Sequence, residues 1–179
     1  MGVKVLLCGM GGYGENYVKE YLERDVLDST LVAIADPFAS RSPLYEKVME
    51  KGIAVYSSPE EFFAQEKVDL TIISSPIHTH YPYVMLALEH GSNVLTEKPV
   101  CFNLTQIEEM EKKSRETGLF VAVGYQLCFS RDVLALKKDI LDGLYGKARR
   151  FKTIRLMRRN DIYYSRSSWA GALDICGEK

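Results

Sequence analysis

Several residue types are scarce in this sequence of 179 residues, and each scarcity excludes a class of protein. The four cysteines, Cys8, Cys101, Cys128 and Cys176, form no C-x-x-C pair, so we expect reduced thiols rather than a disulfide framework or a zinc site. No apolar run approaches the length of a membrane span, and the first residues lead directly into a predicted strand rather than a secretion signal. We therefore expect a cytoplasmic protein that contacts no membrane.

Histidine is scarce as well, with three residues in the whole chain. Two of them, His78 and His80, are separated by a single residue, a spacing that does not place two side chains on one helix face. No cluster of carboxylates accompanies them. We therefore expect no metal site.

Charge is nearly balanced, with a formal net charge of −1, but it is unevenly distributed. Residues 147–166 contain eight lysines and arginines and one acid, Asp161. One interpretation is a solvated strand and loop, and the other is a surface for phosphorylated or acidic ligands. We expect no nucleic-acid partner, because a basic patch without a reader motif says little about nucleic-acid binding.

The most informative stretch of the sequence is 3–36. An apolar run at 3–8 predicts a short buried strand, and the next six residues, Gly9-Met10-Gly11-Gly12-Tyr13-Gly14, form a complete G-x-G-x-x-G motif. An amphipathic helix with Tyr17 on its apolar face follows, and a second strand at 31–35 ends at Asp36. Strand, glycine turn, helix, strand and acid, in this order, are the fingerprint of a dinucleotide-binding fold.

Each residue type in this motif has a physical reason. Gly9 allows a tight turn, Gly11 lets the backbone approach a pyrophosphate, and Gly14 lets the helix pack closely on the strand. The N–H groups and the dipole of that helix favour an anion. Asp36 can accept hydrogen bonds from both hydroxyls of an adenosine ribose and would repel a 2′-phosphate, so we expect NAD or NADP, with NAD slightly favoured. Arg41 is close enough in sequence to offset that preference.

Beyond Asp36, strands and helices continue to alternate. Further strands are predicted at 53–56, 68–74, 93–96 and 119–123, and helices at 42–51, from Ser58, 79–90, 103–117 and 130–141. Six strands joined in this way predict an α/β fold with a doubly wound parallel sheet and right-handed crossovers. Ligands of such sheets bind beyond the carboxyl ends of the strands. That rule places five segments on one rim: Gly9 to Gly14, Asp36, Ser74 to Pro76, Glu97 to Pro99, and Gly124 to Gln126.

Lys98 is the candidate for chemistry on this rim. It lies between Glu97 and Pro99 at a predicted strand end, where we expect it to be buried and to face a bound nucleotide. The alternative is an ordinary salt bridge with Glu97 or a solvated surface charge.

Four motifs together resemble the glucose–fructose oxidoreductase/inositol dehydrogenase (Gfo/Idh/MocA) family of NAD(P)-dependent enzymes. They are the glycine motif, Ser74-Ser75-Pro76-x-x-x-His80, Glu97-Lys98-Pro99 and Gly124-Tyr125-Gln126. The resemblance covers residues 3 to about 157. It implies a Rossmann domain followed by a mostly antiparallel substrate domain, and hydride transfer between the nicotinamide and a carbon of a sugar, polyol or related carbonyl compound.

The same resemblance implies roles for single residues. Lys98 would be catalytic, bonding to the reacting oxygen and moving its proton. The residues implied to bind the cofactor are Gly9, Met10, Gly11, Gly12, Tyr13, Gly14, Asp36, Ser74, Ser75, Pro76, His80, Glu97, Lys98 and Gln126. Cys128 stands where many members have an arginine, and Glu178 stands where they have a histidine after Asp174.

The resemblance also sets the expected domain organisation: a dinucleotide-binding domain at 1–124, and a linker helix with the truncated start of an α+β substrate domain at 125–179. We expect a strand at 148–157 that pairs with a second copy of the chain, giving a homo-oligomer, and disorder at 167–179. Two functions remain open. One is an oxidoreductase acting on a sugar-like substrate, and the other is a nucleotide-binding module, sensor or subunit without turnover. The chain would also fit as a fragment of a longer enzyme.

Overall fold

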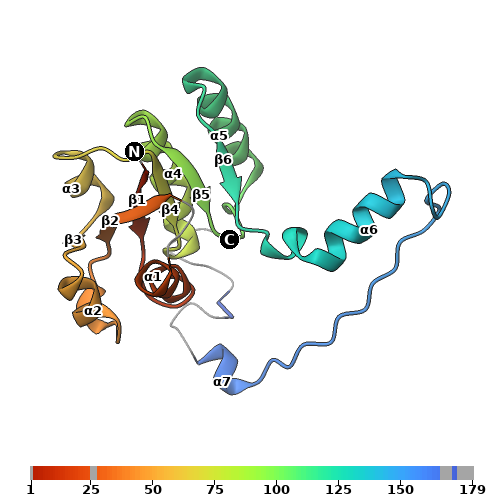
Figure 1. Cartoon of the computed structure of the whole chain (residues 1–179), viewed down its shortest axis with the longest axis horizontal. Coiled ribbons are helices and arrows are strands. Elements are labelled where there is room, and N and C mark those ends of the chain that lie inside the picture. The colour runs from red at the N-terminus through yellow and green to blue at the C-terminus, as the bar shows by residue number, and fades with distance from the viewer. Residues whose placement is uncertain (1, 25–27, 166–170, 173–179) are drawn as a thin grey trace. The chain divides into compact units, whose positions relative to one another are not determined.

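The computed structural model describes residues 2–24, 28–165 and 171–172 (Figure 1). The chain divides into two compact units, Met1–Gly124 and Tyr125–Lys179, which we describe separately. No helix among the described residues is both long enough and apolar enough to cross a membrane.

The first unit is built on a six-stranded sheet in which every neighbouring pair is parallel. The strands lie in the order β3-β2-β1-β4-β5-β6, from left to right in Figure 1, which confirms the predicted Rossmann-type doubly wound fold. Their bounds are β1 Val3–Cys8, β2 Ser29–Ala35, β3 Ala54–Tyr56, β4 Leu70–Ile73, β5 Asn93–Thr96 and β6 Val121–Val123.

Helices cover both faces of this sheet. The bounds of the helices and 3-10 turns in the first unit are α1 Gly14–Glu23, η1 Ala39–Arg41, α2 Tyr45–Glu50, α3 Pro59–Phe63, η2 Ile77–Thr79, α4 His80–Glu89 and α5 Leu104–Thr117. The central strand β1 is buried on both faces: Leu6 belongs to the core cluster beneath α3, α4 and α5, and Leu7 belongs to the cluster beneath α1 and α2. Successive apolar side chains of the strand point to opposite faces of the sheet, so the same strand contributes to both layers of the core.

Local signals fix several helix ends. Asn103 caps α5 by accepting a hydrogen bond from the backbone N–H of Gln106 at 3.0 Å, and Gly118 ends it in the left-handed region at φ 71°. The predicted start of the second helix at 42 is wrong, because α2 begins at Tyr45 after a 3-10 turn. There the Ser42 hydroxyl accepts the backbone N–H of Leu44 and stabilises a turn instead.

The second unit contains η3 Gln126–Phe129, α6 Arg131–Leu141 and α7 Asp161–Tyr164. None of its described residues is buried. The single chain forms no strand at 148–157, where no described segment supplies the neighbour that a strand needs for its hydrogen bonds, and the predicted pairing with a second copy stays a prediction. The predicted disorder at 167–179 lies outside the described residues, apart from 171–172.

Candidate functional site

The glycine turn between β1 and α1 requires glycine at several positions. Gly9 has φ 87°, and a Cβ atom there would lie 2.8 Å from the backbone of Ser75 at the end of β4. Gly12 also lies in the left-handed region, at φ 57°. A Cβ atom on Gly14 would lie 2.1 Å from the carbonyl oxygen of Gly9, so the first turn of α1 packs directly against the loop before it.

Gly11 differs from these glycines. Its φ lies outside the left-handed region, and a Cβ atom there would meet no atom of the described residues within 4 Å. Packing among these residues therefore does not require a glycine at this position, and they leave the space in front of its backbone open. Among the described residues no side chain caps the adjoining N-terminus of α1, which is the positive end of the helix dipole.

Asp36, directly after β2, is tied to the glycine turn. One carboxylate oxygen accepts the backbone N–H of Met10 at 2.9 Å, and the other accepts the N–H of Phe38 at 2.8 Å. The side chain is half-buried, and each of its oxygens keeps a second acceptor position. Arg41 stacks on Phe38 in the same loop, with its guanidinium carbon 4.4 Å from the ring centroid.

The segment after β4 lies beside the glycine turn. The hydroxyl of Ser74 is buried without a hydrogen-bond partner among the described residues, and it lies 3.4 Å from the position of a Cβ atom on Gly14. His80 is 1% exposed, and its two ring nitrogens each lie 2.9 Å from a carbonyl oxygen, one of Ser75 and one of Pro99. Its ring therefore joins the β4 end to the Glu97-Lys98-Pro99 turn, which we call the E-K-P turn.

Lys98 is exposed, so the expectation of a buried lysine is wrong. The acid before it is the buried group, because Glu97 is 6% exposed and turns inward. Its carboxylate accepts a hydrogen bond from the hydroxyl of Tyr17 on α1 at 2.7 Å. The Lys98 ammonium lies over the ring of Tyr13 in the glycine turn, 5.9 Å from the ring centroid.

The first unit thus gathers most of the predicted site residues where its strands end. Gln126 belongs to the second unit, where it begins η3, and its role remains a prediction. Tyr17 was missed as a polar partner, because its position in the helical pattern was assigned to packing alone. The signal was a hydroxyl on the sheet-facing side of a helix, since a buried tyrosine hydroxyl usually finds a hydrogen-bond partner.

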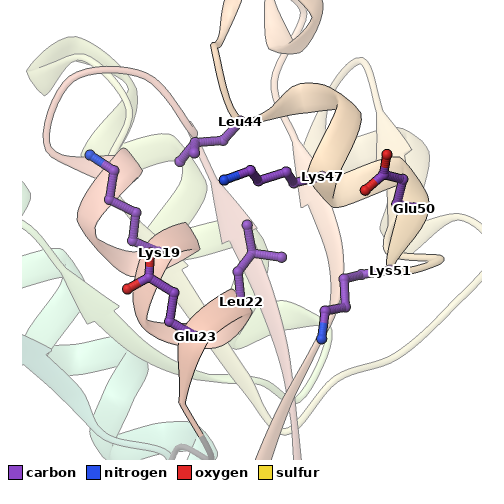
Figure 2. Close-up of a pocket in the computed structure, with 7 residues that line it drawn as sticks. All are labelled: Lys19, Leu22, Glu23, Leu44, Lys47, Glu50 and Lys51. Atoms are coloured by element: carbon purple, nitrogen blue, oxygen red, sulfur yellow. The ribbon is translucent and has the colours of Figure 1, made fainter.

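A pocket of about 440 Å³ lies elsewhere in the first unit (Figure 2). Its lining combines three lysines, two glutamates and two leucines from α1, α2 and their flanking residues: Lys19, Leu22, Glu23, Leu44, Lys47, Glu50 and Lys51. None of the predicted site residues lines this pocket, so it is distinct from the glycine turn.

Comparison with known proteins gives three kinds of match. The sequence model of the GFO/IDH/MocA family, described as an oxidoreductase family with an NAD-binding Rossmann fold, matches residues 3–125. The scyllo-inositol 2-dehydrogenase (NAD(+)) of Bacillus subtilis is 30% identical over 146 residues, which cover 81% of this chain and 42% of that protein. The D-glucoside 3-dehydrogenase of Escherichia coli is 28% identical over 160 residues, which cover 88% of this chain and 44% of that protein.

Among solved structures, scyllo-inositol dehydrogenase from Lactobacillus casei, with bound NAD(H) and scyllo-inositol, superposes with a TM-score of 0.71. The match covers 82% of this chain and 43% of that one, and at 19% sequence identity it shows the fold alone. In each of these three comparisons, this chain spans less than half the length of its relative.

Proposed function

The chain belongs to the GFO/IDH/MocA oxidoreductase family, and from this membership we propose that it binds NAD(H) or NADP(H) at the glycine turn. The open space at Gly11 carries the proposal, because packing among the described residues does not explain a glycine at this position. The unpartnered hydroxyl of Ser74 beside the turn supports it, since a buried polar atom without a partner fits a site that a ligand completes.

Asp36 gives the proposed site a slight preference for NAD. Its oxygens already hold the backbone N–H groups of Met10 and Phe38, and their remaining acceptor positions suit the two hydroxyls of a ribose. A 2′-phosphate would instead be repelled by the carboxylate. The Arg41 guanidinium stacks on the Phe38 ring, so in our proposal the negative charge of Asp36 determines the cofactor preference.

The proposed reaction is hydride transfer, which a bound nicotinamide would supply. In this reaction Lys98 would hydrogen-bond the reacting oxygen and hold or release its proton. The exposure of its ammonium over the glycine turn supports a role at the substrate rather than a role in packing. A sugar or polyol is the substrate class we propose, because relatives named for inositol and D-glucoside dehydrogenation match this chain.

A second candidate function is a nucleotide-binding module without turnover. It is favoured by one observation: no described residue of the second unit is buried, so that unit forms no packed wall for a substrate by itself. Cofactor binding is common to both candidates, and turnover separates them.

We expect Gly11→Val to abolish NADH binding while leaving the fold intact. Valine fits the open space in the free chain but fills the volume that a pyrophosphate would occupy. Fluorescence titration with NADH measures the binding, and a thermal melt by circular dichroism is the control for folding. Equal NADH affinity in the wild type and the variant would show that the site assignment is wrong.

We expect Lys98→Met to leave the dissociation constant for NADH within about twofold of the wild type and to reduce turnover at least 10²-fold, as for loss of a general acid–base group. The assay is reduction of NAD⁺ or NADP⁺ with a panel of sugars and polyols. Retained activity would remove Lys98 from the mechanism. A wild-type chain that binds NADH but turns over nothing in the panel would support the binding module.

A further inference from the structure

Glu97 is a buried carboxylate with few partners. It lies directly after β5 and is 6% exposed. One of its oxygens accepts the Tyr17 hydroxyl at 2.7 Å, and the other lies 3.4 Å from the backbone nitrogen of Lys98. Within the described residues, no lysine, arginine or histidine forms an ion pair with it. A buried charge is costly unless hydrogen bonds compensate it, so the Tyr17 bond is important here.

Gly124, directly after β6, also packs against this carboxylate. A Cβ atom at Gly124 would lie 2.8 Å from one oxygen of Glu97 and 3.1 Å from its carboxyl carbon. Three segments therefore meet at one acid: the first half of α1, the end of β5 and the end of β6. Burial raises the pKa of Tyr17, and its hydrogen bond to Glu97 raises it further, so the hydroxyl keeps its proton and remains a donor.

Tyr17 also supports the Lys98 side chain through Tyr13. The rings of Tyr13 and Tyr17 meet edge to face, with centroids 6.0 Å apart and an interplanar angle of 74°. The Lys98 ammonium lies over the Tyr13 ring. Tyr17 therefore contacts Glu97, the residue before Lys98, through its hydroxyl, and contacts Tyr13, the ring beneath the Lys98 ammonium, through its own ring.

The other end of the E-K-P turn is held independently. The carbonyl oxygen of Pro99 lies 2.9 Å from a ring nitrogen of His80, which is buried on α4. Loss of the Tyr17 hydroxyl would therefore free the Glu97 side chain, while the backbone N–H of Glu97 stays bonded to the Ile73 carbonyl at 2.8 Å and the Pro99 end stays fixed. The expected result is a displaced Lys98 on an intact fold.

We propose that Tyr17 is a positioning residue for Lys98, holding the E-K-P turn against the glycine turn through the Glu97 carboxylate. This inference rests on the proposed function, because it gives Tyr17 a purpose only if Lys98 acts on a substrate. In this proposal α1 has two roles: it begins at the glycine turn, and through Tyr17 it also sets the position of the proposed catalytic lysine.

The decisive variant is Tyr17→Phe, which removes the hydroxyl and keeps the ring that meets Tyr13. Tyr21→Phe is the matched control, because Tyr21 lies one turn later on α1 and its hydroxyl bonds to the Ser29 side chain at 3.1 Å, away from the E-K-P turn. The position of Lys98 is read by NMR of ¹³C-methylated lysines, with its signal assigned by Lys98→Arg. In Tyr17→Phe we expect that signal to move toward those of lysines that lie over no aromatic ring, because the Tyr13 ring would no longer lie beneath the ammonium, and in Tyr21→Phe to stay unchanged.

A second variant perturbs the same acid from the residue that follows β6. Gly124→Ala would place a methyl group against the Glu97 carboxylate, so we expect it to move the Lys98 signal as well. An unchanged Lys98 signal in both Tyr17→Phe and Gly124→Ala, or equal changes in Tyr17→Phe and Tyr21→Phe, would overturn the proposal.

Kinetics give an independent readout wherever turnover is found. Tyr17→Phe should lower kcat about tenfold, the effect of losing one hydrogen bond to a charged group, with KM and the NADH dissociation constant nearly unchanged. A fall in affinity with kcat intact would contradict a positioning role. Absence of NADH binding in the wild type would overturn the proposed function, while the NMR comparison would still decide whether Tyr17 positions Lys98.

Discussion

At the scale of single residues, the loops around the glycine turn are fastened by side chains that bond to backbone atoms. Asp36 holds two N–H groups, and the ring of His80 bridges two carbonyl oxygens. Two of these bonds, Asp36 to Met10 and His80 to Pro99, join segments that are distant in sequence, and all four satisfy backbone groups in the loops beyond the strand ends. The same side chain can therefore serve the fold and the proposed site together.

Asp36→Ala tests whether this side chain both stabilises the fold and binds the cofactor. We expect the variant to lose about 1 to 3 kcal/mol of stability, because two N–H groups lose a charged acceptor, and to bind NADH at least tenfold more weakly. Its preference should shift toward NADPH, because the negative charge is gone. Dissociation constants for both cofactors and a urea unfolding curve measure these effects.

The control for Asp36 is Asp69→Ala. Asp69 lies just before β4, and its carboxylate accepts the backbone N–H of Lys4 at 2.7 Å. This bond lies where β1 and β4 begin, at the opposite end of the strands from the glycine turn. The variant should cost stability without changing either dissociation constant. A wild-type chain that binds NADPH tenfold more tightly than NADH would contradict the preference we assign to Asp36.

Residue identities on the rim were predictable because the glycine motif, Asp36 and Glu97-Lys98-Pro99 follow strands whose direction the alternating pattern determines. The orientation of Glu97 and Lys98 was not predictable. Glu97 rather than Lys98 points inward because Gly124 has no side chain to block its carboxylate and because the Tyr17 hydroxyl bonds to it. Gly124 and Tyr17 are both distant from Glu97 in sequence.

At the scale of elements, the start of α5 depends on one side chain. We expect Asn103→Ala to lower the free energy of unfolding by about 1 kcal/mol, because the backbone N–H of Gln106 would lose its capping acceptor. Thr105→Ala, in the first turn of the same exposed helix, should change it by a few tenths of a kcal/mol at most. Urea unfolding of the two variants checks the difference, and equal losses would contradict the cap.

Strand positions and most helix ends were predictable, because the patterns that indicate a buried parallel strand or a capped helix lie in adjacent residues. The exceptions have a common cause. The start of α2 and the absent strand at 148–157 depend on contacts that local sequence does not contain: the turn around Ser42 in one case, and a neighbouring strand in the other.

At the scale of the whole molecule, the second unit presents an unusual amount of apolar surface. Phe151, Ile154 and Leu156 are 86%, 74% and 92% exposed. Exposed apolar segments of this kind mark contact surfaces, and an extended backbone offers unpaired N–H and C=O groups to another chain. We therefore propose that 148–157 pairs with a second copy of the chain.

Light scattering should then show self-association that grows with protein concentration. Replacing Ile154 and Leu156 by aspartate should weaken it, whereas Leu144→Asp, which changes an exposed leucine outside 148–157, should not. A strict monomer with slow amide exchange across 148–157 would contradict the proposal, since it would mean that the segment pairs within its own chain.

The sheet order also determines how the chain is assembled during synthesis. β1 lies at the centre, yet its neighbour β4 follows far along the chain, and the hydrogen bond from Lys4 to Asp69 spans 65 residues. At ribosomal rates of about 5–20 residues per second, one edge of β1 stays open for roughly 3 to 13 s after the strand is made. Of the strands in this sheet that pair on both sides, β1 therefore spends the longest time with one side unpaired. We expect a nascent-chain chaperone to bind this apolar segment during that time.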